Sequence, residues 1–364
     1  MSILLVVLIL IVLIVVHELG HFVVAKILKV RVEEFGLGYP PRAYSFGRIG
    51  DTLYTFNWLP FGGFVKLYGE DPTMQVSGQS RRGNFSDSSR AAQALILVAG
   101  VAANILLAWT LFSLGFMSGM PSVAPEGEQG ARLFVSRVVS DSPAHSAGLL
   151  SGDEILGIKD SGTESVVSPT SADVIEFVRE RPGEPVEIEF RRRGEIMTKV
   201  IVPSQGVLEE NSARPALGVA LTSVASIKLP FGEAVSAGFF QTGEALAAVV
   251  VGVADLIGGA FAGSANLQSV VGPVGLVGVV DEASRYGAGH LFGLAAFISV
   301  NLAIINLIPI PALDGGRLVI VGLEALIRRK TPNVAFQVAN LLGFAFIIFL
   351  MVAVTYNDIA RLIT

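Results

Sequence analysis

IVLIVVHELGHFVVAKILKV, residues 11–30, is the stretch that decides the fold and the chemistry of this chain. It places His17, Glu18 and His21 in the middle of an apolar run that is long enough to cross a bilayer. A charged group at that depth costs about 2.5 to 3.5 kcal/mol on insertion scales. We therefore expect these three side chains to serve a function.

The two histidines and the glutamate have the H-E-x-x-H spacing. On a helix, residues i and i+4 share a face, so both imidazoles can reach one metal ion. Glu18 lies about 100° around the helix, near enough to take a proton from a water molecule that the metal activates. Zinc suits two imidazoles and a carboxylate, with a fourth position left for water. The alternative is a pair of histidines that hydrogen-bond across a helix bundle.

A third ligand is expected from a second apolar run, NLAIINLIPIPALDGGRLVIV at 301–321. Asp314 is the only acidic residue in this run, and Pro309 and Pro311 break the helix before it. Broken backbone at membrane depth is tolerated only beside protein or a water-filled cavity, which a hydrolytic site needs. Asp314 could instead cap a helix at 315–327, and capping is compatible with ligation.

The composition is that of a membrane protein: 364 residues, 52% of them hydrophobic, with a mean hydropathy of +0.63. A net charge of −5 and the lack of a dense Lys/Arg block give no reason to expect a nucleic-acid partner. The chain has no cysteine, which excludes disulfides, thiolate metal ligands and thiol nucleophiles. No basic residue precedes Lys26 and no small-x-small cleavage site follows the first run, so we expect a retained membrane helix.

The spans predict a polytopic α-helical protein with about four transmembrane helices. The expected spans are 3–28, 92–118, 291–327 (with an interruption) and 334–356. Basic residues gather in 29–91 and at 328–330, and the positive-inside rule places both segments in the cytoplasm. The two termini and residues 119–290 are then expected outside the cytoplasm.

The segment 230–265 is expected to form an amphipathic helix at the outer interface. Glu233, Glu244 and Asp255 are spaced by eleven residues and therefore share one helical face. Taking an acidic stripe through a bilayer is costly, whereas an interfacial helix keeps it in water. A fifth span is the alternative, and it would place 328–330 on the wrong side.

Residues 121–225 are expected to form a small α+β domain. Apolar and polar residues alternate, as in half-buried strands, at 132–139, 153–160, 185–193 and 196–203. The sequence SADVIEFVRERPG, 171–183, predicts one helix with Ser171 at its N-cap and a Pro-Gly stop.

HELGH in the first span and NLIPIPALDGG, 306–316, in the third resemble the site-2 protease family of intramembrane zinc metalloproteases. The similarity extends over nearly the whole chain, through FGLGYPPR at 35–42, LPFGGFVKLYGED at 59–71 and VVGPVGL at 270–276. The resemblance implies one Zn²⁺ per chain with His17, His21 and Asp314 as ligands. It also implies that Glu18 is the catalytic base and that the site lies near the cytoplasmic face.

The resemblance implies residues that hold the substrate as well. Asn306 opens the N-x-x-P-x-P-x-L-D-G pattern, where the family is thought to hold the substrate backbone, and Asn301 resembles a second such position. The alternative for either asparagine is an interhelical hydrogen bond.

The stretch 51–69 has the composition of a β-hairpin with Gly62 and Gly63 near its turn. It is similar to the membrane-re-entrant β-loop of the family, and we expect Gly62, Gly63 and Phe64 to contact a locally unwound substrate added as a strand. A cytoplasmic hairpin packed on the helix ends is the alternative.

Two stretches of the outer domain, SPAHSAGLLSGDEILGI at 142–158 and RPALGVA at 214–220, resemble bacterial PDZ domains. The second is similar to the strand and glycine loop that receive a peptide C-terminus. We therefore expect one PDZ-like unit in which Leu217, Gly218 and Val219 bind a peptide as an added strand.

The predicted organisation is a first membrane half (1–118), a PDZ-like domain (121–225), an interfacial helix (230–265) and a second membrane half (291–364). The predicted function is that of a zinc endopeptidase of a bacterial cytoplasmic (inner) membrane that cleaves transmembrane segments. The expected partners are the lipid bilayer and transmembrane substrates that another protease has first shortened; the resemblance implies anti-sigma factors or remnant signal peptides. The alternative is a non-catalytic PDZ membrane scaffold with a structural metal site, which would be indifferent to Glu18→Gln.

Overall fold

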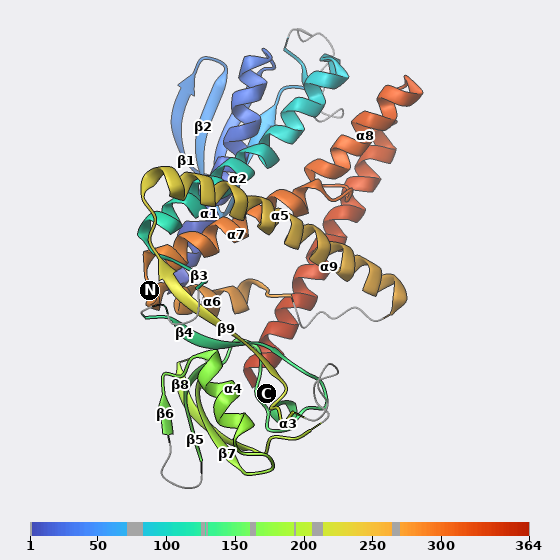
Figure 1. Cartoon of the computed structure of the whole chain (residues 1–364). Helices are drawn as coiled ribbons and strands as arrows, with labels where there is room; N and C mark the ends of the chain where they lie inside the picture. Colours follow the sequence, from blue (N-terminus) through green and yellow to red (C-terminus); the bar gives the residue numbers. More distant parts are fainter. Residues whose placement is uncertain are drawn as a thin grey trace. The chain divides into compact units, whose positions relative to one another are not determined.

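The computed structural model describes residues 2–70, 83–124, 128, 130–160, 165–192, 194–205, 214–263 and 270–363. Parts of the predicted segments 29–91, 121–225 and 230–265 lie outside these residues. The chain divides into two compact units (Figure 1). One comprises Met1–Met117 with Pro230–Thr364, and the other is Ser118–Leu229.

The first unit is mainly helical. In chain order it contains α1 (Ser2–Ile27), β1 (Val32–Ile49), β2 (Thr52–Leu67), the 3-10 helix η2 (Phe85–Asp87), α2 (Arg90–Ser118), α5 (Phe231–Ala262), α6 (Pro273–Arg285), α7 (Ala288–Leu307), α8 (Asp314–Ile327) and α9 (Asn333–Ile363). Within the described residues, α1, α2, α5, α7 and α9 are the five helices that are long and apolar enough to cross a membrane. The chain is therefore a multi-pass membrane protein.

The candidate spans differ from the predicted ones at two places. The predicted third span, 291–327, is two helices: α7 is long enough to cross by itself, and α8 is a separate helix of 14 residues. In addition, the length and composition of α5 allow it to cross a membrane. The acidic side chains of Glu233, Glu244 and Asp255 are all exposed on α5, and its interfacial placement stays a prediction.

The β-segment is built differently from the predicted hairpin. Residues 34–37 of β1 lie between two stretches of β2, because Glu34 is opposite both Leu53 and Lys66, and Leu37 is opposite both Phe56 and Gly63. β2 must therefore reverse direction between these stretches, and Gly62 has the positive φ of 120° that favours such a turn. The predicted reversal near Gly62 exists. The predicted pairing is wrong, since the two arms pair with β1 and not with each other.

An apolar cluster joins the two sequence-distant parts of this unit. Its buried members come from α1, β1, β2, α2 and α8 and the segments beside them: Ala25, Val30, Val32, Leu67, Phe85, Ile96, Leu97 and Val321. The helices α1 and α2 lie especially close, because a Cβ atom on Gly20 would overlap the backbone carbonyl of Ala99. Small residues at such a contact allow two membrane helices to approach closely. This contact directs one face of α1 toward α2.

The described residues of the second unit form an antiparallel sheet and two short helices. Its elements are β3 (Met120–Val123), β4 (Arg132–Val138), α3 (Pro143–Ser146), β5 (Glu154–Asp160), β6 (Ser165–Val167), α4 (Ser171–Arg179), β7 (Val186–Arg192), β8 (Glu195–Ile201) and β9 (Val219–Ile227). The strand order is β3-β9-β4-β5-β7-β8, with β6 paired to β5. The four predicted strands and the predicted helix are present, and α3 is an additional helix. The apolar core of the second unit includes Val135, Ile158, Phe177 and Phe190.

The N-cap of α4 is Thr170, one residue before the predicted Ser171. Thr170 Oγ1 accepts a hydrogen bond from the Asp173 backbone N–H at 3.2 Å, and Asp173 Oδ2 accepts one from the Thr170 N–H at 2.8 Å. This reciprocal capping box satisfies two donors that a helix start leaves unpaired. The hydrogen bonds from Thr170, the backbone N–H first and the hydroxyl second, lower the pKa of Asp173 from its ordinary value.

We predict that Thr170→Ala weakens the first turn of α4 by about 1 kcal/mol. The pKa of Asp173 is lower in the folded chain than in the unfolded one, so its stabilising contribution is complete above the ordinary value of about 3.9 and is lost as pH falls through the folded pKa. The first turn of α4 should therefore be less stable in Asp173→Asn than in the wild type at neutral pH, and the two stabilities should become equal in acid. Hydrogen exchange of amides 172–174 measures both effects. Thr198→Ala on β8 is the control, and equal protection in all variants would contradict the prediction.

Candidate metal centre

The side chains of His17, His21 and Asp314 meet in the first unit. Both histidines are buried on α1, where the i and i+4 spacing aligns them on one face. Asp314 is the first residue of α8, and Leu313 occupies the N-cap position before it. Asp314 is therefore not the cap of this helix, which was the alternative considered from the sequence. Its carboxylate faces the two imidazoles instead.

Three atoms of these side chains form a small triangle. His17 Nε2 lies 3.0 Å from Asp314 Oδ2, His21 Nε2 lies 3.2 Å from the same oxygen, and the two Nε2 atoms are 3.1 Å apart. Tetrahedral zinc with bonds of about 2.0 to 2.1 Å separates its ligand atoms by about 3.3 Å. Two imidazoles and a carboxylate are also a ligand set that zinc accepts. The geometry and the chemistry of this group both fit a metal ion.

The remaining ring nitrogen of His21 decides which nitrogen can bind a metal. His21 Nδ1 lies 2.7 Å from the backbone oxygen of Ile96. Because a carbonyl oxygen only accepts, Nδ1 carries the hydrogen and Nε2 is left with its lone pair. A hydrogen bond of this kind orients a metal-binding histidine. The contact is between α1 and α2, so it depends on the close approach of these helices.

Asn104 on α2 stands in the corresponding place for His17. Its side chain is fully buried, Nδ2 lies 3.4 Å from His17 Nδ1, and Oδ1 has no hydrogen-bond partner among the described residues. When His17 Nε2 binds a metal, Nδ1 carries a hydrogen and needs an acceptor. A half-turn of the Asn104 amide places Oδ1 at that position. Asn104 was not among the residues predicted from the sequence; the signal that could have indicated it is a lone amide in the middle of an apolar span.

Gly100 on α2 makes room for both imidazoles. A Cβ atom on this residue would overlap the ring of His21 and lie 2.8 Å from His17 Cε1. Any other residue would therefore displace the two rings. Gly100 was not predicted from the sequence either, because an isolated glycine in an apolar helix carries no local signal of what it faces.

A cavity of about 890 Å³ lies against the triangle. Its lining includes the predicted catalytic residue Glu18 and the predicted substrate-binding residues Gly62, Gly63, Phe64 and Asn306. An added Cβ atom on Gly63 would lie 3.4 Å from Glu18 Cγ, so β2 runs directly beside this glutamate. The structure thus brings a metal-binding group, an acid/base group and a strand into one cavity.

The two predicted asparagines are placed differently. Asn306 Nδ2 lies 3.4 Å from His17 Nε2, and the residue lines the cavity. Asn301 donates from Nδ2 to the backbone oxygen of Phe297 at 2.8 Å, within its own helix, and is not among the described residues that line the cavity. Of the two, only Asn306 is presented to the metal-binding group.

The predicted peptide-binding residues Leu217, Gly218 and Val219 lie in the second unit. Gly218 has a φ of 80°, which favours glycine, and its carbonyl oxygen accepts a hydrogen bond from Val139 N–H at 2.8 Å. Val219 opens β9, which pairs with β4 over residues 219–224 and with β3 over residues 224–227. The edge of residues 219–222 that faces away from β4 carries no paired strand in the described part of the chain.

Residues 5–350 match the model of the family described as "Peptidase family M50". A "Putative zinc metalloprotease" of Clostridium perfringens is 35% identical over 349 residues, covering 95% of this chain and 95% of the relative. Zinc metalloprotease RasP of Bacillus licheniformis is 28% identical and covers 95% and 96%. Regulator of sigma-W protease RasP of Bacillus subtilis is 28% identical and covers 95% of each.

Among solved structures, the PDZ domain of an SdrC-like protein from Listeria monocytogenes is 22% identical. The match covers 28% of this chain and 92% of that chain, with a TM-score of 0.21.

We predict that Gly100→Ala abolishes zinc binding, because the new methyl group would occupy the space of the His21 ring and press on His17. Metal analysis of the purified protein in detergent measures the zinc content per chain. Gly243→Ala on α5 is the matched control, since a Cβ there meets no atom within 4 Å. Wild-type zinc content in the Gly100→Ala protein would contradict the packing argument.

We predict that Asn104→Leu weakens zinc binding by about 10- to 100-fold, the usual effect of removing a hydrogen-bond partner of a metal-binding histidine. Asn104→Asp should keep most of the affinity, because its carboxylate can accept from His17 Nδ1–H. Competition with a chelator of known affinity measures the constants. Thr110→Val on the same helix is the control. Equal affinities for the Leu and Asp variants would show that Asn104 does not orient His17.

Proposed function

The chain belongs to peptidase family M50, and from this premise we propose that it hydrolyses peptide bonds of other membrane proteins inside the bilayer. It is a zinc metalloprotease, as the family match and the named relatives show. The family resemblance, the enzyme class and the zinc cofactor predicted from the sequence are thereby confirmed. The residues, the substrates and the orientation in the membrane are proposals.

A single observation carries the proposed site. Three metal-binding atoms from α1 and α8 lie within 3.2 Å of one another, beside Glu18 and in the wall of a cavity of about 890 Å³. Ionisable groups within membrane helices are costly and mark functional sites. We propose that His17, His21 and Asp314 bind the zinc ion and that Glu18 is the catalytic base.

Bound zinc supplies Lewis acidity, which polarises a peptide carbonyl and lowers the pKa of a water molecule. Glu18 then accepts a proton from the attacking water on its carboxylate and delivers a proton to the leaving amine nitrogen. Asn306, whose amide reaches His17, donates a hydrogen bond to the substrate backbone. The cavity provides space for a substrate segment next to these groups.

The substrate must be unwound before it reacts, because the carbonyl of a helical peptide bond is hydrogen-bonded within its helix. Residues 63–67 of β2 pair with β1 on one side, and several of them line the cavity. An unwound segment added to this edge has its exposed backbone groups satisfied. We therefore propose strand addition to β2 at Gly62, Gly63 and Phe64. Asn301, which hydrogen-bonds within its own helix, is not part of this proposal.

The second unit is proposed to bind a peptide C-terminus at Leu217, Gly218 and Val219. The support is the unpaired edge of β9 at 219–222, together with the positive φ of Gly218 in the loop before it. A strand added at this edge would be the PDZ mode of recognition.

We propose a bacterial cytoplasmic membrane as the location, with the metal site toward the cytoplasm because the basic connections lie at that end. The Bacillus subtilis relative is named a regulator of sigma-W protease, which supports regulatory membrane proteins such as anti-sigma factors as substrates. Their prior shortening by another protease is part of this proposal. The alternative, a non-catalytic PDZ scaffold, differs in needing no base at position 18.

We predict that Glu18→Gln abolishes cleavage and leaves zinc binding intact, because the amide cannot accept the proton but all three proposed ligands remain. The chain is co-expressed with a single-pass substrate that lacks its outer domain, and the cytoplasmic fragment is measured by immunoblot at equal enzyme levels. Glu282→Gln, the same chemical change on α6, is the control and should cleave like the wild type. Equal fragment with Glu18→Gln and the wild type would favour the scaffold.

A further inference from the structure

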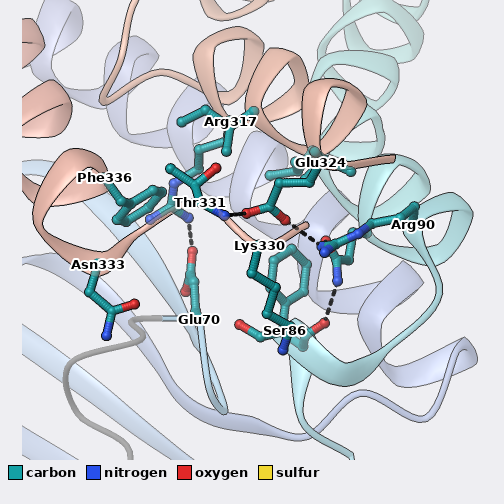
Figure 2. Close-up of a pocket in the computed structure, with 14 residues that line it drawn as sticks. Glu70, Ser86, Arg90, Arg317, Glu324, Lys330, Thr331, Asn333 and Phe336 are labelled. Atoms are coloured by element: carbon teal, nitrogen blue, oxygen red, sulfur yellow. Dashed lines mark hydrogen bonds and ion pairs between the residues drawn. The ribbon is translucent and has the colours of Figure 1, made fainter. Parts of the chain in front are cut away.

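Two walls of the active-site cavity are joined by an ion pair between Glu70 and Arg317. Glu70 follows the end of β2, and Arg317 lies on α8, three residues after Asp314. Both side chains line the cavity, and Figure 2 shows them pointing toward each other. The pair therefore connects the strand proposed to hold the substrate with the helix proposed to hold the metal.

Glu70 is held in place by the turn that carries it. Its Oε2 accepts a hydrogen bond from the backbone N–H of Leu67 at 3.1 Å, at the end of the strand that lines the cavity. Gly69 has a φ of 70°, and a Cβ atom there would overlap the side chain of Asn84. The carbonyl oxygen of Gly69 accepts a hydrogen bond from Ser86 Oγ at 2.5 Å. The carboxylate is thus presented from a fixed turn.

Arg317 is held by a helix with a defined docking face. Arg317, Leu318, Val321 and Glu324 follow one another at helical spacing, so they lie on one side of α8. Leu318 and Val321 join the apolar cluster of the first half, and Glu324 forms an ion pair with Arg90 at 2.7 Å. Among the described residues that line the active-site cavity, Arg317 is the only Lys or Arg.

The space behind the pair is not filled by apolar side chains. A second pocket, of about 170 Å³, lies beside the pair and is shown in Figure 2. Glu70, Leu97, Arg317 and Phe336 line both this pocket and the active-site cavity. The two walls also share the apolar cluster that contains Leu67 of β2 and Val321 of α8, and the ion pair adds a polar contact between them at the cavity. Partly buried pairs of this kind contribute little to stability, and their best-attested use is to fix a register.

We propose that Glu70 and Arg317 are positioning residues for the reaction: their ion pair fixes residues 63–67 of β2 against the helix that begins with Asp314. A substrate backbone added to β2 is thereby brought to the metal site in register. This inference rests on the proposed function, since it needs β2 to hold the substrate. It assigns neither residue a contact with the reacting atoms.

The test is a double-mutant cycle on the purified protein with a transmembrane peptide substrate. Glu70→Gln and Arg317→Gln should each lower kcat by about 10- to 100-fold, the effect of a misplacement of about 1 Å, with KM and zinc content changed much less. The kcat of the double variant should be no lower than that of the less active single variant, because either change already breaks the pair. Arg317→Lys should recover part of the loss by restoring the charge.

The control is a second ion pair close by that does not line the active-site cavity. Lys330 Nζ lies 3.1 Å from Asp87 Oδ1 in an exposed position. Asp87→Asn and Lys330→Gln should leave kcat and KM at wild-type values. Wild-type kcat in Glu70→Gln and Arg317→Gln would overturn the inference. So would losses that multiply in the double variant, because Arg317 would then act on the substrate independently of Glu70.

A cross-link tests whether positions 70 and 317 stay together during the reaction or must separate to admit the substrate. The chain has no cysteine, so Glu70→Cys combined with Arg317→Cys can be bridged by a bifunctional maleimide without side reactions at other thiols. The bridged protein should be more active than the unbridged double variant. Loss of activity on bridging would overturn the inference, because it would show that positions 70 and 317 must separate for the reaction to proceed. Wild type and Glu18→Gln are measured in the same assay, so that equal cleavage by these two reports failure of the proposed function instead.

Discussion

The structure depends on one electrostatic constraint: three ionisable side chains must satisfy one another inside an apolar helix bundle. His17, His21 and Asp314 bring their side-chain N and O atoms within 3.2 Å of one another, although His17 and Asp314 are 297 residues apart in the chain. Unpaired, each would carry the cost of a polar group in hydrocarbon. A shared cation would resolve this, because it would turn two imidazole lone pairs and a carboxylate into ligands. The close contact of α1 with α2, and the docking of α8, can be understood as what makes that triangle possible.

The residues proposed to bind the metal and to act as the base stand out in the sequence, while the residues that support them do not. His17, Glu18 and His21 carry their chemistry in their spacing, and Asp314 is the only acidic residue in a broken span. Asn104 and Gly100 matter only because α2 lies against α1 at that height, and no local pattern encodes which helices are neighbours. The sequence also could not tell that Asn306 lines the cavity while Asn301 hydrogen-bonds within its own helix, because this too depends on which helices are neighbours.

The fold shows a similar division between local and distant information. Apolar periodicity located the helices, yet length and composition alone leave α5 as either a span or an interfacial helix. Strand composition located β2 and the turn near Gly62, but the insertion of residues 34–37 between its two arms is a long-range pairing. The same sheet topology leaves residues 63–67 as the stretch beside the cavity. What the sequence could not provide is therefore the geometry on which the proposed substrate positioning depends.

The Pro-Gly block explains how two residues eight positions apart reach one histidine. On an unbroken α-helix, Asn306 and Asp314 would be separated by about 12 Å along the axis. In the structure, Asn306 Nδ2 and Asp314 Oδ2 lie 3.4 and 3.0 Å from the same atom, His17 Nε2. The helix ends at Leu307 and restarts at Asp314, and a Cβ on Gly315 would overlap the backbone of Leu307. The proline residues end α7, and Gly315 allows the first turn of α8 to lie directly against the last residue of α7. The break thus brings the amide of Asn306 and the carboxylate of Asp314 to the same atom of His17. Because α8 begins at Asp314, Arg317 lies in its first turn, where it forms the ion pair with Glu70.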